Sequence, residues 1–348
     1  MSVTVHPAEA LIADAATRRL HERSLVFDGL AIAYVLDEKY AQRCLEGGVN
    51  AANVTFALEE SWDKTAQIFE RNLAKIDKSP LLLLCKTSDE VLAAKEKGKL
   101  GIVIGTQGAS MMDSAEQFWR LESMVRMGLR FLGLAYTTAN DFGDGCGERR
   151  DAGLTYLGEE LIAFANTLPI MLDLSHCGHR TRAEATALSR APVCTHSNSD
   201  ALRANGRNTT DATVKAMAAK GGMIGVCGLP QSLADQTPTL DDLLNHVDHF
   251  VRLVGAQHVG IGMDYVESFQ DQTGDVVAPP SVVMWRTRRP DIFGPLSAFG
   301  RQSYPIGVES VRKLPNFTQG LLDRGHSVAD VEAMLGGNWL RAMRKFCG

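Results

Sequence analysis

The chain has 348 residues, of which 45% are hydrophobic and 22% are charged, so it has enough apolar material for a sizeable core. This composition excludes a disordered or collagen-like chain. The 36 basic and 41 acidic residues give a net charge of −5, which argues against nucleic acid or an anionic membrane as the main partner. The length is compatible with two domains or with one α/β barrel.

The cellular compartment is predicted from the ends of the chain and its cysteines. The first residues, MSVTVHPAEALIADAATRRLHERS, lack the apolar run of a secretory signal. The seven cysteines have no repeated spacing, which is typical of reduced intracellular thiols. The longest apolar stretch, at 82–85, is far too short to span a membrane. We therefore expect a cytoplasmic protein without a membrane partner.

Short apolar segments alternate with amphipathic stretches along most of the chain. Strands are predicted at 25–32, 49–56, 100–106, 129–136, 170–176, 192–196, 221–227 and 258–264. Helices are predicted at 36–46, 59–77, 87–97, 113–127, 156–167, 180–189, 211–219 and 239–254. Eight strands, each followed by a helix, are typical of a (β/α)8 TIM-like barrel. A doubly wound open sheet is the alternative, because periodicity alone does not separate the two.

The remaining segments complete a single domain, 1–348. The apolar run at 82–85 is interpreted as an excursion before the third barrel strand. Residues 266–306 predict a long irregular insertion after the eighth strand, which we expect to be a lid over the site or the contact of a homodimer. Two helices are expected within 307–348, at 318–325 and 328–346.

Polar residues follow the predicted strands, where the active site of such a barrel lies. In chain order they are Asp28, Asn53, Gln107, Tyr136, His176, His196 and Asp264. Two histidines on successive strands and a carboxylate on the eighth suit a zinc ion that activates water. Alternatively, the two histidines are hydrogen-bonded core residues, and Asp264 caps a loop or pairs with a histidine.

Several motifs occur in an order that matches a known family. DLSH is followed by THSN, then GRN, then HVGIGMD, and NDFGDGCGERRDAGLT precedes them. In this combination the sequence resembles the membrane dipeptidase (renal dipeptidase) family of metallopeptidases, from about Asp28 to the C-terminus. The segment NDFGDGCGERRDAGLT resembles a loop of the bacterial members of this family. The resemblance implies a (β/α)8 barrel and the hydrolysis of dipeptides.

The resemblance also implies a pair of zinc ions, but the ligands of that pair are incomplete here. The family's first-strand His-x-Asp pair corresponds to Leu30 and Ile32, and its bridging glutamate corresponds to Gln107. Apolar side chains do not bind such cations, and a neutral amide does not bridge two of them. The two histidines of the second ion remain, as His176 and His196. We expect one zinc ion at most, and metal-free protein is the alternative.

The substrate-binding part of the family site is better preserved. Arg207, with Asn208, matches the position that holds a substrate carboxylate, to which a guanidinium group can donate two hydrogen bonds. Asp264 matches an acid of the family and is a candidate for proton transfer or water orientation. Tyr136 stands where some members have a histidine that polarises the substrate, and Tyr136 or Gln107 would stabilise an oxyanion.

Three functions follow from this pattern. The leading one is a dipeptidase-like hydrolase with a reduced metal site, acting on a small amide or dipeptide with a free carboxylate. The second is a metal-free enzyme of altered chemistry on a small zwitterion, and the third is a non-catalytic protein that binds such a molecule. Cys146, in the loop GDGCG, is a further candidate nucleophile, although packing within the loop is the simpler interpretation.

Overall fold

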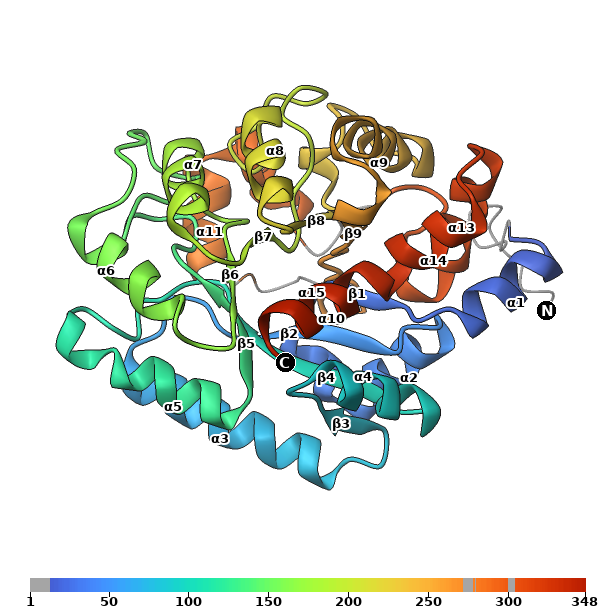
Figure 1. Cartoon of the computed structure of the whole chain (residues 1–348). Helices are drawn as coiled ribbons and strands as arrows, with labels where there is room; N and C mark the ends of the chain where they lie inside the picture. Colours follow the sequence, from blue (N-terminus) through green and yellow to red (C-terminus); the bar gives the residue numbers. More distant parts are fainter. Residues whose placement is uncertain (1–12, 272–277, 279, 300–303) are drawn as a thin grey trace.

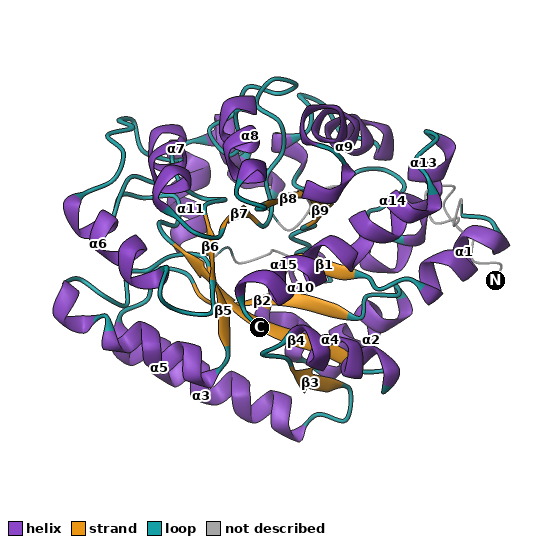
Figure 2. Cartoon of the chain, in the orientation of Figure 1, coloured by secondary structure: helices purple, strands orange, loops and turns teal. Residues whose placement is uncertain are grey.

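The computed structural model describes residues 13–271, 278, 280–299 and 304–348, which form a closed barrel of parallel strands (Figures 1 and 2). The barrel strands are β1 (Phe27–Ile32), β2 (Ala51–Ala57), β4 (Leu100–Thr106), β5 (Leu129–Gly133), β6 (Met171–Asp173), β7 (Pro192–Cys194), β8 (Met223–Val226) and β9 (Val259–Ile261). Pairing of Asp28 in β1 with Ile261 in β9 closes the ring. The predicted (β/α)8 barrel is confirmed, and closure excludes the open-sheet alternative.

The apolar run before the third barrel strand forms a short outer strand. This strand, β3 (Leu82–Leu84), pairs with the start of β4, whereas β5 pairs with the end of β4. Residues 51–57 of β2 also pair with β4, so β3 lies outside the ring. The predicted excursion is confirmed.

Helices surround the barrel, as Figure 2 shows. They are α1 (Ala15–Arg23), α2 (Glu38–Glu46), α3 (Trp62–Lys78), α4 (Ser88–Glu96), α5 (Trp119–Met127), α6 (Tyr156–Ala165), α7 (His179–Leu188), α8 (Asp211–Ala219) and α9 (Leu240–Val254). The barrel strands are almost entirely buried because helices cover them outside and side chains fill them inside, which explains their continuous apolar sequence. Among the described residues, no helix has the length and apolar character needed to cross a bilayer.

Three helices follow in the C-terminal part of the chain, and the last of them closes one end of the barrel. They are α13 (Pro315–Asp323), α14 (Val328–Glu332) and α15 (Asn338–Phe346), with a π-helical turn between the last two. The indole of Trp339 in α15 donates a hydrogen bond to Ile261 O at 3.0 Å. A Cβ atom on Gly260 would lie 2.6 Å from this indole, so only glycine allows the close approach. Figure 1 shows α15 across the barrel opening. Because α15 closes this end of the barrel, a ligand site is expected at the other end, where the carboxyl ends of the strands lie.

The segment after β9 differs from the irregular insertion predicted at 266–306. It contains three short helices, α10 (Glu267–Gln270), α11 (Pro280–Arg288) and α12 (Pro290–Phe293). Prolines at the first positions of α11 and α12 suit helix starts, where no backbone N–H is needed. The parts of this prediction at 272–277, 279 and 300–303 lie outside the described residues.

Candidate active site

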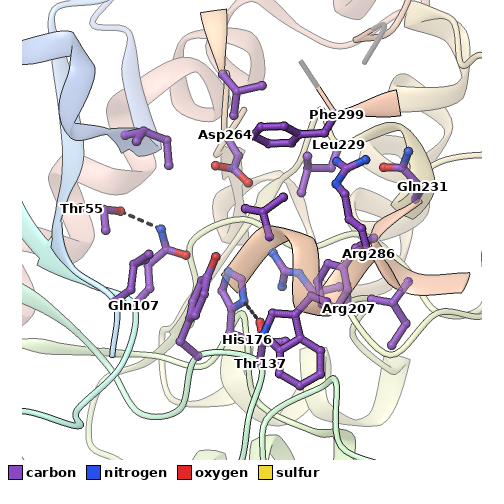
Figure 3. Close-up of a pocket in the computed structure, with 18 of the residues that line it drawn as sticks. Thr55, Gln107, Thr137, His176, Arg207, Leu229, Gln231, Asp264, Arg286 and Phe299 are labelled. Atoms are coloured by element: carbon purple, nitrogen blue, oxygen red, sulfur yellow. Dashed lines mark hydrogen bonds between the residues drawn. The ribbon is translucent and has the colours of Figure 1, made fainter. Parts of the chain in front are cut away.

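A cavity of about 360 Å³ opens at the carboxyl ends of the barrel strands. Five of the predicted site residues line it: Gln107, Tyr136, His176, Arg207 and Asp264. Figure 3 shows the Gln107 amide, the Asp264 carboxylate and the His176 ring around one common space. The other predicted residues, Asp28, Asn53, His196 and Asn208, do not line the cavity.

The two histidines face each other directly. The Nε2 atoms of His176 and His196 lie 3.0 Å apart, so one ring donates a hydrogen bond to the other. The Nδ1 atoms are also occupied: that of His176 lies 3.0 Å from the Thr137 hydroxyl, and that of His196 lies 2.7 Å from the Thr195 hydroxyl. Burial, followed by the charge of Arg207, lowers the pKa of both imidazoles well below the ordinary value, so both are neutral at pH 7.

Asp173 sets the proton positions in this pair. The Thr195 hydroxyl donates to Asp173 Oδ2 at 2.5 Å, and His196 Nδ1 must therefore donate to Thr195. Neutral His196 then accepts at Nε2 from His176. Asp173 Oδ1 accepts three further hydrogen bonds, from the backbone and hydroxyl of Ser175 and from the backbone of Thr195. The sequence interpretation missed Asp173, although it precedes His176 in the motif DLSH.

Arg207 is a buried cation with spare hydrogen-bonding capacity. Its Nη1 donates to Ser175 O, while its Nε has no hydrogen-bond partner in the part of the chain that the structure describes. No carboxylate within the described ranges lies within ion-pair distance of this guanidinium. A buried donor without a partner is costly, and a ligand oxygen would relieve that cost. This arrangement suits an anion that enters the cavity.

Asn208 positions Arg207 rather than facing the cavity. Its side-chain amide donates to the carbonyls of Arg203 at 2.7 Å and Ser232 at 2.9 Å. The backbone carbonyl of Asn208 accepts a 2.6 Å hydrogen bond from Arg182, another residue that the sequence interpretation missed. Arg182 is fully buried and donates to several backbone carbonyls, so it stabilises the loops around Arg207.

Asp264 has an unusual backbone and an unusual pKa. Its φ of 56° lies in the left-handed region, which aspartate tolerates better than most residues. The Tyr304 hydroxyl donates to its carbonyl and holds this conformation. Burial raises the pKa of the Asp264 carboxyl to about 7, with Arg207 opposing the shift and Asp28 adding to it. A carboxyl group with such a pKa can accept and return a proton near neutral pH.

The raised pKa of Asp264 predicts a pH-dependent stability. The folded protein binds this proton more tightly than the unfolded chain, so stability should fall as pH rises from about 4 to about 7. Asp264→Asn removes the charge and keeps a residue that accepts positive φ. We expect its free energy of unfolding, measured by urea titration, to exceed that of the wild type at pH 8 by about 1 kcal/mol or more and to match it at pH 4.

Asp28 stays in the variant and titrates in the same range, so part of the pH dependence should remain. The exposed Asp235, changed to Asn, is the matched control and should show no such difference. An Asp264→Asn effect of equal size at both pH values would contradict the assignment.

Gln107 and Tyr136 are two further polar residues that line the cavity. Gln107 Nε2 donates to the Thr55 hydroxyl at 2.8 Å, and Figure 3 shows its carbonyl oxygen turned to the cavity. The Tyr136 ring packs against His176, with ring centroids 4.2 Å apart. Burial raises the pKa of the Tyr136 phenol, which therefore remains a hydrogen-bond donor at neutral pH.

The donor set does not fit a two-metal centre. Leu30 is buried and Ile32 lines the cavity, and neither has a ligand atom. Within the part of the chain that the structure describes, no group of three or more His, Cys, Asp and Glu side chains is placed to hold a metal ion. His176 and His196 supply two imidazoles, whereas a catalytic zinc site ordinarily has three protein ligands.

Cys146 lies beside the site but is not activated. Its thiol is buried, and burial raises its pKa, which disfavours the nucleophilic thiolate. Its backbone N–H donates to His176 O at 2.8 Å, so the loop supports the histidine through the main chain. This geometry favours the packing interpretation of Cys146.

The chain has a TIM-like barrel of the amidohydrolase-like fold, with a cavity at the carboxyl ends of its strands. Residues 18–292 match the model of the membrane dipeptidase family (Peptidase family M19), and the chain belongs to this family. The family is zinc-dependent, and the membership agrees with the resemblance drawn from the sequence motifs.

Two curated fungal proteins and one solved structure illustrate the relationship. An uncharacterized dipeptidase of Schizosaccharomyces pombe is 25% identical over 307 residues, which cover 83% of this chain and 65% of that protein. Dipeptidase aclJ of Aspergillus oryzae is 27% identical over 252 residues, 71% of this chain and 51% of that protein. The chain thus spans about half to two thirds of these relatives. A crystal structure of an amidohydrolase from Pseudomonas aeruginosa is 30% identical, with a TM-score of 0.83 over 95% of this chain and 99% of that chain.

Proposed function

We propose that the protein is a dipeptidase-like hydrolase of a small amide or dipeptide with a free carboxylate, and that it uses one metal ion at most. The observation that carries this proposal is the buried Arg207 side chain, which lines the cavity and whose Nε has no hydrogen-bond partner among the described residues. Membership in the dipeptidase family supports amide hydrolysis as the reaction. Asn208 contributes by positioning the Arg207 loop.

Four polar residues of the cavity have roles in this proposal: Arg207, Asp264, Tyr136 and Gln107. Arg207 binds the carboxylate and fixes the orientation of the amide. Asp264, with its pKa near 7, accepts the proton of the attacking water and returns it to the leaving amine. The Tyr136 hydroxyl, or the Gln107 amide after it turns from Thr55, donates to the oxyanion that forms on the amide carbonyl.

His176 and His196 are the residues we propose for a single ion. A bound metal ion would supply positive charge that polarises a water molecule for attack. His176 could then use Nε2 only in its other tautomer, with the proton on Nδ1, where the Thr137 hydroxyl would accept it. The roles of Arg207, Asp264 and Tyr136 do not depend on this ion.

The experiment combines turnover and binding. Protein purified without chelators is assayed on dipeptides such as Ala-Phe, with and without added zinc, while calorimetry measures binding of the same dipeptides. We expect carboxylate-dependent binding together with product formation. Absence of both binding and turnover would contradict the proposal.

A second candidate is a non-catalytic protein that binds the same ligand. It is favoured by the direct hydrogen bond between the two imidazoles, because each ring nitrogen already has a partner without a metal. Tight dipeptide binding without any product, in both the zinc-supplemented and the zinc-free protein, would establish this candidate and overturn the hydrolase.

A further inference from the structure

One part of the cavity wall is apolar and comes from the segment after β9. We call it the aromatic wall, and its members are Phe269, Val282, Trp285, Ile292, Phe293 and Phe299. Two ring pairs give it a defined shape: Phe269 and Phe299 have centroids 4.9 Å apart, and Trp285 and Phe293 have centroids 6.1 Å apart. Both pairs are tilted, with interplanar angles of 55° and 51°, and such ring contacts stabilise the apolar surface that they form.

The aromatic wall is fixed to the loops that carry the polar residues. Arg289, at the end of α11, donates to Gly147 O at 3.0 Å. A Cβ atom on Gly147 would lie 2.8 Å from the Trp285 ring, so the ring packs directly on that loop. On the other side, the Ile292 side chain lies 3.0 Å from the Cβ position of Gly206, next to Arg207. The apolar wall therefore adjoins the guanidinium within a single cavity.

Arg286 lies next to the aromatic wall, and its guanidinium group contacts the wall and the loop that follows α12. Arg286 donates to Pro295 O at 3.1 Å, and its guanidinium lies over the Phe299 ring, 5.4 Å from the centroid. Its charge is thus partly held by a carbonyl and an aromatic face. The other described members of the wall offer a ligand only apolar side chains.

We propose that the ligand held by Arg207 also carries a large apolar group, aromatic or branched, which packs against the aromatic wall. The substrate class is then an N-acyl amino acid or dipeptide with such a side chain, rather than one built from glycine and alanine. This inference rests on the proposed function, because it assumes that Arg207 binds the carboxylate. Its physical basis is the removal of apolar surface from water on both partners.

Calorimetry with two probes tests the inference. N-acetylglycine and N-acetylphenylalanine share the carboxylate and the amide and differ in one benzyl group. Full burial of a phenylalanine side chain corresponds to about a 10- to 100-fold gain in affinity, and we expect the wild type to prefer N-acetylphenylalanine by at least tenfold. Trp285→Ala should reduce this preference to about threefold or less, with little change for N-acetylglycine.

Trp119→Ala is the matched control, because it removes an exposed tryptophan that does not line the cavity. It should keep the full preference. Thermal unfolding checks that each variant is folded, and Phe293→Ala replaces Trp285→Ala if the latter does not fold. Equal affinity of the wild type for both probes would overturn this inference and leave the proposed function intact. If neither probe binds, both this inference and the proposed function are overturned.

Discussion

Arg207→Ala is expected to weaken binding of carboxylate ligands by about 30-fold or more, since truncating one partner of a buried charge pair costs about 2–5 kcal/mol. The reason is the geometry around the guanidinium. Its Nη1 donates to Ser175 O, while Nε is buried and finds no partner within the described ranges of the chain. Calorimetry with N-acetylphenylalanine measures the loss.

An uncharged ligand separates the role of the carboxylate from general packing. The wild type should bind N-acetylphenylalanine much more tightly than N-acetylphenylalaninamide, and Arg207→Ala should bind both equally weakly. Arg207→Lys keeps the charge and loses the planar pair of donors, so its affinity should be intermediate. Arg312→Ala, which removes an exposed arginine of a surface ion pair, is the control. An unchanged preference for the carboxylate in Arg207→Ala would contradict the assignment.

Asp173→Ala is expected to lower the free energy of unfolding by about 3 kcal/mol or more, since each buried donor left without an acceptor costs about 1–3 kcal/mol. The carboxylate accepts four hydrogen bonds from Ser175 and Thr195, and its removal leaves those donors buried without an acceptor. Denaturant unfolding followed by tryptophan fluorescence measures the effect.

The same variant should also disturb the imidazole pair. Without the acceptor on Asp173, Thr195 can donate to His196 Nδ1. The tautomers of His196 and His176, and the direction of the hydrogen bond between them, are then no longer fixed. Asp173→Asn keeps one acceptor oxygen and should cost less than Asp173→Ala. Asp235→Ala, at an exposed surface ion pair, should change stability by less than about 1 kcal/mol. A similarly small effect of Asp173→Ala would show that the network does not stabilise the site.

The barrel could be predicted because its strands are buried on both faces and therefore appear as continuous apolar runs. The same pattern located Gln107, Tyr136, His176 and Asp264, since each follows a strand and the strand ends meet at one rim. The segment after β9 was harder, because α11 and α12 are short and α11 has no clear amphipathic period. Their flanking prolines at 280 and 290 were the available signal.

The hydrogen bonds that support the cavity residues, such as those of Asp173 and Asn208, could not be predicted from the sequence. Asp173 is two residues from Ser175, but its bond to Thr195 depends on the pairing of β6 with β7. Asn208 follows Arg207 directly, yet its side chain points to backbone carbonyls instead of the cavity. Neighbours in sequence share a loop, and only the folded loop decides which of them faces the ligand.

The central claim is that this member of the dipeptidase family has lost the donors for a pair of metal ions. The most direct test is the zinc content per chain, measured by mass spectrometry after incubation with excess zinc and removal of free metal. We predict one equivalent at most, which should disappear in the His176→Ala, His196→Ala double variant. Two equivalents in the wild type, both lost in that variant, would contradict the account.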